Sequence, residues 1–241
     1  KNKQYVFKCI VKIYFRGLRN LSLYNKKLFI FDLDGTLVDT APDFRNSLNY
    51  MLSEMGQPLV SLEEIRKYVG YGARELIKRT AVAKKMSTNS SKINEMLRVF
   101  LLHYTHNIDD DSVLFDNVLN VLKFLKKKDI KLAVCTNKME KLSLMLLEKL
   151  EVLTYFDYLV GGDTFKKSKP DPMPLFEICK YLNQKTDDAI MIGDSVTDLN
   201  AGHRANMPVV LVEYGYTDNK DIYNDADLVI NNFSQLKDLF T

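Results

Sequence analysis

Carboxylates that directly follow apolar runs are the residues of this sequence most able to do chemistry. Asp32 and Asp34 come just after the first such run, and Asp194 and Asp198 come just after the fourth. Because parallel strands end at one edge of a sheet, we expect these side chains to converge there. Carboxylates brought together repel one another unless a cation compensates them. An all-oxygen site of this kind suits Mg²⁺, which keeps water among its ligands.

Residues able to bind phosphate follow other apolar segments. Thr136 and Asn137 come after the second run, and Lys169 lies in a Lys-Pro-Asp-Pro segment between the third and fourth runs. A lysine ammonium, a hydroxyl and loop N–H groups can together hold phosphate oxygens. Combined with several carboxylates and a divalent cation, these residues predict phosphoryl transfer. One aspartate can attack phosphorus to form an aspartyl phosphate, and a second can act as general acid and base.

The apolar runs themselves predict strands buried on both faces, because they are short, aliphatic and bounded by Gly, Asp or Asn. Amphipathic segments lie between them, at 116–128, 138–150, 172–181 and 197–206. This alternation predicts an α/β fold, with a doubly wound (Rossmann-like) parallel sheet and right-handed crossovers. The predicted strands are Leu28–Phe31, Lys131–Cys135, Tyr158–Val160, 189–192, Val209–Val212 and Leu228–Ile230.

A segment with only helical patterns separates the first two strands. Asp32 and Thr136 are 104 residues apart, far more than one strand–helix–strand unit requires. We therefore expect a small all-helical cap at 41–111, inserted after the first strand of a core made of 27–40 and 112–241. Such a cap excludes bulk water and contacts the non-phosphate part of a small substrate. Its predicted helices are 43–54, 62–69, 73–82 and 91–107.

Charge is distributed unevenly along the chain. The 241 residues carry a net charge of +3, but residues 1–31 hold eight lysines and arginines and no acidic residue, so the remainder has a net charge of −5. This acidic body does not favour a nucleic-acid or membrane partner. The basic segment 1–26 is a targeting leader, an interaction arm or a start-site artefact, and we leave it out of the fold. Three widely spaced cysteines and the lack of a long apolar run predict a cytoplasmic protein.

Four segments, in order, resemble the motifs of the haloacid dehalogenase-like hydrolase superfamily. They are Asp32-Leu-Asp-Gly-Thr-Leu-Val38, Thr136-Asn137, Lys169-Pro-Asp-Pro172 and Gly193-Asp-Ser-Val-Thr-Asp198. The resemblance covers about residues 28–241. It implies a Mg²⁺-dependent phosphatase in which Asp32 is the nucleophile and Asp34 is the general acid and base for an alcohol leaving group.

The same resemblance implies roles for the other motif residues. Lys169 would orient Asp32 as well as contact the phosphoryl group, and Asp34 would bind the metal through its backbone carbonyl. The implied metal ligands are Asp32, Asp34 and Asp194, with Asp198 in support. The implied phosphate-binding residues are Thr136, Asn137 and Lys169.

One cap segment resembles a narrower group of proteins. Val69-Gly-Tyr-Gly-Ala-Arg-Glu-Leu76 is similar to the loop-to-helix segment of bacterial phosphoglycolate phosphatases. Gly70 and Gly72 permit tight turns near a ligand, and Arg74 at the start of a helix can attract a substrate carboxylate. The implied substrate is a small phosphorylated acid, 2-phosphoglycolate above all, hydrolysed to glycolate and phosphate.

Other functions stay open at this point. A β-phosphoglucomutase-like enzyme uses the same two aspartates, although its fourth motif usually opens with Glu-Asp where this chain has Gly193-Asp194. A pyrophosphatase or nucleotidase of the same fold is compatible with the sequence. A non-catalytic binding module that uses the basic leader belongs to another class, but it leaves the filled catalytic motifs unexplained. The oligomeric state is not predicted.

Several further residues are better explained by structure than by chemistry. His103 and His106 are spaced for one metal ion but lack a third ligand nearby. Cys135 lies within a strand, where packing is the expected role. Asp43 and Asp163 are expected to cap helices or anchor loops.

Overall fold

Six parallel strands form the sheet of the core, in the order β5-β4-β1-β6-β7-β8. The computed structural model describes residues 23–240. Strand β1 is central: β4 and β5 lie on one side of it, and β6, β7 and β8 lie on the other. The strand order therefore reverses at β1. The predicted α/β fold with a doubly wound parallel sheet is therefore confirmed. The strands are β1 Leu28–Phe31, β4 Lys131–Cys135, β5 Tyr158–Val160, β6 Ala189–Gly193, β7 Val209–Val212 and β8 Leu228–Ile230.

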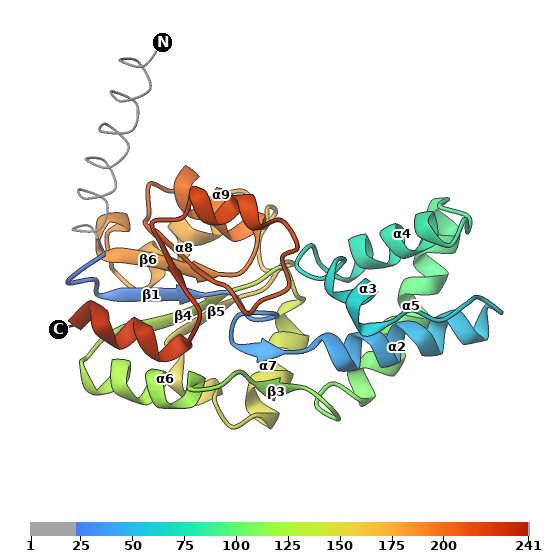
Figure 1. Ribbon diagram of the computed structural model, residues 1–241, viewed down its shortest axis with the longest axis horizontal. Coiled ribbons are helices and arrows are strands. Elements are labelled where there is room, and N and C mark those ends of the chain that lie inside the picture. Colours follow the sequence, from blue (N-terminus) through green and yellow to red (C-terminus); the bar gives the residue numbers. More distant parts are fainter. Residues whose placement is uncertain (1–22, 241) are drawn as a thin grey trace, which may run out of the picture.

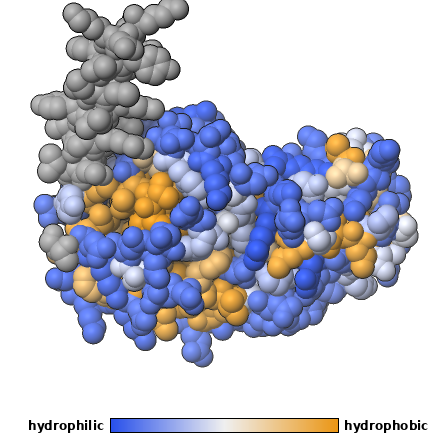
Figure 2. Space-filling view, viewed as in Figure 1, coloured by the Kyte–Doolittle hydropathy of each residue, from blue (hydrophilic) through white to orange (hydrophobic). Residues whose placement is uncertain are grey.

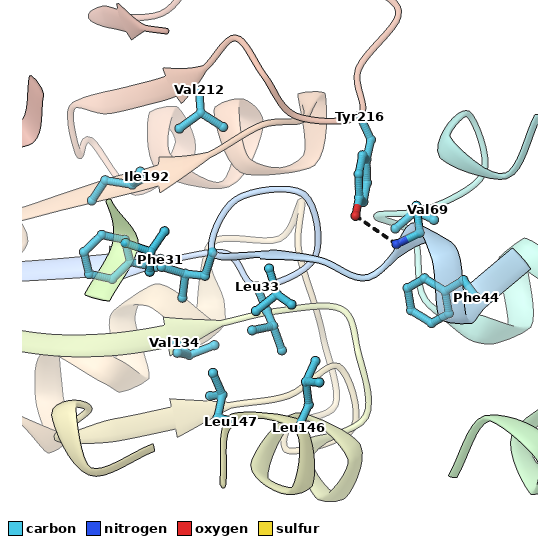
Figure 3. Packing of buried hydrophobic residues seen from close by; sticks show 14 of the residues in the cluster. Phe31, Leu33, Phe44, Val69, Val134, Leu146, Leu147, Ile192, Val212 and Tyr216 are labelled. Atoms are coloured by element: carbon cyan, nitrogen blue, oxygen red, sulfur yellow. Dashed lines mark hydrogen bonds between the residues drawn. The ribbon is translucent and has the colours of Figure 1, made fainter. Parts of the chain in front are cut away.

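Helices cover both faces of this sheet. In β1, Phe29 and Phe31 pack into one apolar cluster together with residues of α6, α7 and η4, whereas Leu28 and Ile30 pack into a second cluster with α8 and α9. Figure 3 shows the first of these clusters around Phe31. Because both faces of the sheet are covered by helices, successive strand residues are apolar, which accounts for the unbroken apolar runs. The helices of the core are α6 Val118–Lys127, α7 Glu140–Lys149, α8 Met173–Tyr181, α9 Val196–Arg204 and the 3-10 segments η1 Leu153–Tyr155, η2 Thr186–Asp188, η3 Lys220–Asn224 and η4 Phe233–Phe240.

Four helices form a separate lobe beyond the carboxyl ends of the strands (Figure 1). Helix α2 packs along α5, where the Phe44 ring stacks on those of Phe100 and Tyr104, with centroids 6.2 and 4.7 Å away. Apolar residues at helical spacing on α5 are buried there, as their periodicity indicates. The helices are α2 Ala41–Glu54, α3 Leu62–Arg66, α4 Ala73–Ala83 and α5 Ser90–His106. This lobe is called the cap below.

A short antiparallel ladder joins the cap to the core. Strand β2 (Val38–Asp39) pairs with β3 (Val113–Leu114), so the chain enters and leaves the cap side by side. The Asp43 carboxylate accepts hydrogen bonds from the backbone N–H groups of Asp111 and Ser112, at 2.8 to 3.2 Å, and ties the two connections together. The anchoring role expected of Asp43 is thus seen. Two-residue strands have too few residues for a periodic pattern, so the sequence did not indicate the ladder.

Packed structure begins earlier than the expected boundary at residue 27. Leu23 is 2% exposed and belongs to the apolar core, and the ammonium of buried Lys26 donates to the backbone carbonyl of Asp187. The expectation that all of 1–26 stands outside the fold is therefore wrong for residues 23–26, because the Leu23 and Lys26 side chains both contact the core. Residues 1–22 of the predicted leader lie outside the described residues. Between residues 23 and 240, no helix combines the length and the apolar character needed to cross a membrane.

Candidate active site

Asp32 lies at the reversal point of the sheet, where α/β folds bind ligands. It follows β1 directly, and its backbone N–H donates to the carbonyl of Ile192 on β6. The residue is 3% exposed. Its Oδ1 accepts a hydrogen bond from the N–H of Leu33, at 2.7 Å, and lies 2.9 Å from the Lys169 Nζ. The carboxylate is thus held in one orientation by its own turn and by a lysine 137 positions further along the chain.

Two more carboxylates reach the same place from the turn between β6 and α9. Asp198 sits in the first turn of α9, and its Oδ2 accepts from the N–H groups of Asp194 and Ser195 at 3.3 and 3.0 Å. Its Oδ1 is 2.6 Å from the Lys169 Nζ. One oxygen each of Asp32, Asp194 and Asp198 lie within 4.8 Å of one another. The fold thus brings together side chains of the first and fourth motifs, with Lys169 of the third beside them.

Glycines make room for this group of carboxylates. A Cβ on Gly215 would lie 2.2 Å from the Cβ of Asp194, and one on Gly193 would lie 2.3 Å from the Cγ of Asp198. Gly35 has a φ of +89°, and its added Cβ would come within 2.6 Å of the Asp194 Oδ2. Side chains at these positions would displace the carboxylates, so backbone must approach them directly.

The three buried carboxylates are compensated by too little positive charge, and the pKa values of two of them are raised as a result. Burial, followed by the neighbouring Asp198, raises the pKa of Asp32 from its ordinary 3.8 to about 7. Burial and then Asp198 raise the pKa of Asp194 as well. Burial alone lowers the pKa of Lys169, but Asp198 and Asp32 outweigh it and raise that pKa above its usual range. One ammonium faces three carboxylates here, so the residues fit a hard divalent cation such as Mg²⁺ bound through oxygen.

Asp34 faces a different set of partners. Its Oδ1 accepts a hydrogen bond from the Thr40 hydroxyl, at 2.8 Å, and lies 3.2 Å from the Lys138 Nζ. The side-chain oxygens of Asp34 do not belong to the three-carboxylate group within the described chain. Lys138, which the sequence analysis did not single out, is 5% exposed. The sequence does place this lysine two residues after Thr136. Its position at the start of the predicted helix 138–150, however, made it resemble an exposed charge at a helix terminus.

A cavity opens beside Asp32 and Asp34, between the core and the cap. Figure 2 shows the notch at which the two lobes meet. From the core, Thr136, Asn137 and Lys138 line the cavity. From the cap, its lining residues include Phe44, Val69, Gly70, Gly72, Leu76 and Tyr104. The glycine loop identified in the sequence thus lies at this cavity, together with Thr136.

Asn137 uses its side chain to join loops. Its Nδ2 donates to the backbone carbonyls of Gly70 and Lys169, at 2.9 and 3.0 Å. These two bonds tie the cap loop to the Lys-Pro segment of the core. The side-chain amide hydrogens of Asn137, which was expected to bind phosphate, are therefore already engaged. Its Oδ1 is buried without a hydrogen-bond partner among the described residues.

Arg74 is not brought to the cavity. Its side chain is exposed, and its Nη1 donates to the Oδ1 of Asn94 on α5, at 2.8 Å. It is absent from the residues of the described chain that line the cavity. The expectation that Arg74 meets the substrate therefore has no support in this geometry, because α4 turns that face of its first turn toward α5.

The remaining residues have the structural roles expected of them. The Nδ1 of His103 lies 3.0 Å from the Ser47 hydroxyl and that of His106 lies 2.7 Å from the Leu102 carbonyl, and neither belongs to a metal-type group within residues 23–240. Cys135 is buried in β4, where burial raises the pKa of its thiol to about 12. Asp163 accepts the N–H of Glu140 at the start of α7, at 2.7 Å.

The family model of the haloacid dehalogenase-like hydrolases matches residues 29–212, which contain all of these carboxylates and the cap. This chain belongs to that family. Two relatives named phosphoglycolate phosphatase are similar to it over most of their length. The protein from Mesorhizobium japonicum is 38% identical over 212 residues, covering 88% of this chain and 93% of its own. That from Nitrosospira multiformis is 36% identical over 206 residues, covering 85% and 91%.

A solved structure agrees with the architecture of this haloacid dehalogenase-like hydrolase. The crystal structure of a predicted phosphoglycolate phosphatase from Haemophilus somnus matches it with a TM-score of 0.84 and 28% identity, covering 90% of this chain and 99% of that one. Core and cap are both included in a match of this extent. The resemblance inferred from four short motifs therefore extends to the fold as a whole.

Proposed function

We propose that this hydrolase cleaves phosphomonoesters through an aspartyl phosphate on Asp32, and that 2-phosphoglycolate is its principal substrate. The observation that carries the proposal is the convergence of Asp32, Asp194, Asp198 and Lys169 at one edge of the sheet. The cavity beside Asp32 also contains Asp34 and Thr136. A nucleophile, a general acid and base, a hydroxyl and a lysine are thereby available around one small space.

The residues that would hold Mg²⁺ are Asp32, Asp194 and Asp198 through carboxylate oxygens and Asp34 through its backbone carbonyl. When bound, the cation compensates the charge of the carboxylates and of the phosphoryl group. Lys169 supplies the positive charge already built into the fold, and its bonds to Asp32 and Asp198 keep it in place. Thr136, 3% exposed at the end of β4, offers its hydroxyl to the phosphoryl oxygens.

The first chemical step uses Asp32 and Asp34. A carboxylate oxygen of Asp32 forms a bond to phosphorus while the ester oxygen–phosphorus bond breaks, and the departing oxygen takes a proton from Asp34. Within the described chain, both hydrogen bonds to Asp34 fall on Oδ1, so Oδ2 is left to exchange that proton. Phe44, Leu76 and the rest of the apolar cap wall exclude bulk water from this step.

The second step returns both residues to their starting state. Asp34, now a carboxylate, takes a proton from one water molecule, and the hydroxide so generated attacks phosphorus. The bond between phosphorus and Asp32 breaks, which releases inorganic phosphate and restores the Asp32 carboxylate. The same two residues thus serve in both halves, and no external acid is needed.

The substrate assignment is supported by the relatives and by the cavity. Both relatives described above carry the name phosphoglycolate phosphatase, and the glycine loop, which resembles that of bacterial phosphoglycolate phosphatases, lines the cavity beside Asp34. The position of this cavity, between cap and core, suits a small phosphorylated acid. The buried free thiols of Cys135 and Cys179 support a reducing, cytoplasmic location.

The test is a substrate panel measured by phosphate release with Mg²⁺ present. It compares 2-phosphoglycolate with hexose phosphates, nucleotides and pyrophosphate, and follows sugar phosphates separately for isomerisation without phosphate release. We expect 2-phosphoglycolate to have the highest kcat/KM. Preference for a nucleotide or hexose phosphate would overturn the substrate assignment, and isomerisation without release would indicate a mutase instead.

A further inference from the structure

Lys138 is a buried cation that the proposed hydrolytic steps leave without a role. It follows Thr136 by two residues and lines the cavity with Asp32 and Asp34. Its Nζ lies 3.2 Å from the Asp34 Oδ1 and donates a hydrogen bond to the Tyr104 hydroxyl, at 2.5 Å. Burying an ammonium is costly unless its surroundings compensate it, so its position calls for an explanation.

Aromatic rings of the cap hold this ammonium in place. The Nζ lies 4.3 Å from the centroid of the Phe44 ring and 4.5 Å from that of Tyr104. Both distances are within the range of cation–π attraction. Phe44 belongs to α2 and Tyr104 to α5, whereas Lys138 belongs to the core. The ammonium therefore sits where the cap meets the core, next to the residue that would protonate the leaving group.

The Tyr104 hydroxyl is set up to extend this arrangement. Its oxygen accepts the hydrogen bond from Lys138, so its own O–H is available for a further acceptor. Burial, and then the nearby Asp34, raise the pKa of Tyr104 well above its ordinary value, so the hydroxyl keeps its proton. Lys138 and Tyr104 thus offer two donors, one of them charged, at the same side of the cavity.

Other cations near the cap are placed less favourably. Arg74 is exposed and bonded to Asn94. Arg66 and Lys67 line a second cavity, whose lining shares Asp34 with the first and includes Asp194 and Tyr216 but neither Asp32 nor Thr136. Arg66 is also engaged with Asp39, at 3.1 Å. Among the described residues that line the cavity of Asp32, Lys138 is the one with a positive charge.

We propose that Lys138, with Tyr104, binds the carboxylate of the substrate and so makes the enzyme selective for phosphorylated acids. This rests on the proposed function. In 2-phosphoglycolate the carboxylate carbon is two covalent bonds from the ester oxygen that Asp34 protonates. A group that contacts the Asp34 carboxylate is therefore within reach of the substrate carboxylate when the phosphoryl group lies at Asp32. The substrate carboxylate would add a second anion, beside Asp34, to compensate the charge of this buried ammonium.

The experiment compares two substrates in matched variants. Ethyl phosphate has the same chain length as 2-phosphoglycolate but ends in a methyl group, and the measured quantity is the ratio of their kcat/KM values with Mg²⁺. Lys138→Met keeps an unbranched side chain between the two rings and removes the charge. We expect this variant to lower the ratio about 100-fold, the effect of losing a charged hydrogen bond. Arg74→Gln and Arg66→Gln are the controls, and we expect each to leave the ratio within about threefold of the wild-type value.

Using a ratio separates binding of the carboxylate from positioning of Asp34. If Lys138 merely orients Asp34, Lys138→Met lowers kcat/KM for both substrates by the same factor, and the proposal is wrong. A large loss of the ratio in Arg74→Gln or Arg66→Gln instead would assign the carboxylate to that arginine. A wild-type enzyme without preference between the two substrates would contradict the proposed function itself, before any variant is considered.

A second variant covers the case in which Lys138→Met does not fold. Tyr104→Phe keeps the ring beside Phe44 and Lys138 but removes the hydroxyl. We expect the ratio to fall about 10-fold, because one of the two donors is lost. A ratio unchanged in Tyr104→Phe, combined with one unchanged in Lys138→Arg, would overturn the proposal, since the longer planar guanidinium cannot occupy the same place between the rings.

Discussion

The three-carboxylate group at the sheet edge and the Lys138–Tyr104 pair at the cap are assembled by the chain in different ways. Asp32 and Asp198 are oriented mainly by the backbone of their own turns, with Lys169 bridging them. The pair at the cap instead depends on side chains from separate elements that meet only when the cap is in place. The first region is thus built into the core, whereas the second depends on how cap and core fit together.

Under the proposed function, the two regions have separate tasks. The sheet edge would supply the chemistry common to all phosphomonoesters, which a shared scaffold can supply unchanged. The cap would recognise the rest of the substrate, through contacts that can change without disturbing the carboxylates. Variants at the sheet edge should therefore affect every substrate alike, and variants at the cap should affect substrates selectively.

Asp32→Asn is expected to have the largest effect. An amide cannot attack phosphorus as a carboxylate does, so turnover should fall by about 10⁴-fold or more for both 2-phosphoglycolate and ethyl phosphate. Phosphate release under single-turnover conditions is the measurement. Asp43→Asn, which alters a buried anchoring carboxylate outside the cavity, serves as the control for general loss of structure. Activity near the wild-type level in Asp32→Asn would remove Asp32 from the role of nucleophile.

Lys169→Met is expected to affect both activity and stability. It leaves the buried Asp32 and Asp198 carboxylates facing each other, and breaking a buried pair in this way costs about 3 kcal/mol. Turnover should fall about 10³-fold for both substrates because a donor to the reacting groups is lost. Urea unfolding without divalent cations measures the first effect and phosphate release the second.

A lysine in an exposed pair provides the comparison. Lys149 contacts Asp109 at 2.6 Å with 45% of its side chain exposed. We expect little change in unfolding for Lys149→Met, since exposed pairs contribute little. If Lys169→Met and Lys149→Met lowered the free energy of unfolding equally, the buried ion pairs of Lys169 would contribute no more to stability than an exposed pair.

Removal of the divalent cation should silence the enzyme and reveal a pH dependence of stability. In the cation-free protein the pKa of Asp32 is about 7, compared with an ordinary value of 3.8. Between these values the folded state holds a proton that the unfolded chain has lost, so stability decreases as the pH rises. Mg²⁺ should relieve this loss above about pH 7 but compete with the proton below it.

Thermal unfolding with EDTA and with Mg²⁺ measures this effect at two pH values. We expect Mg²⁺ to raise the Tm by on the order of 3 °C more at about pH 8 than at about pH 5.5. The Asp32→Asn variant is the control, because it removes the titrating carboxylate and should reduce the difference. A larger Mg²⁺ effect at the lower pH would contradict a cation site built on Asp32.

Most of the fold and the sheet-edge site could be predicted from the sequence because their determinants are local. Apolar runs of four or five residues mark buried strands, and Asp32 and Asp194 follow such runs directly. Once parallel strands are assumed, their carboxyl ends must meet. Asp198 was likewise foreseeable, since it lies in the first turn of the helix that follows Asp194.

The cap side could not be predicted in the same way, because its contacts depend on the packing of distant segments. Lys138 and Tyr104 are 34 residues apart and meet only after α5 has packed against α2. Arg74 was chosen for its charge and its place after two glycines, but helical phase decides which way its side chain points. Asn137 similarly became a link between loops, which no local pattern indicates.

Tyr216 connects the two regions and gives the smallest but most discriminating prediction. Its backbone N–H donates to the Oδ2 of Asp194 at the sheet edge, at 2.7 Å. Its hydroxyl accepts the N–H groups of Thr40 and Ala41 at the start of α2, at 2.7 and 3.0 Å, and donates to Asp39. Figure 3 shows the ring of Tyr216 reaching toward the cap. The Thr40 hydroxyl donates to Asp34 and makes no capping bond, so the Tyr216 hydroxyl caps the start of α2 instead.

Tyr216→Phe separates these connections because it removes only the hydroxyl. Two helix-terminal donors and one carboxylate oxygen lose their partner, which should lower the free energy of unfolding by about 1 to 2 kcal/mol and loosen the cap. The backbone bond to Asp194 remains, so the Mg²⁺ concentration for half-maximal activity should stay unchanged while preference for 2-phosphoglycolate over ethyl phosphate falls about threefold. Tyr214→Phe, which loses a single bond to the Thr36 carbonyl, is the matched control. If the Mg²⁺ concentration for half-maximal activity changed in Tyr216→Phe but not in Tyr214→Phe, the cap and the cation site would be coupled through the Tyr216 side chain. The two regions would then have to be treated as one.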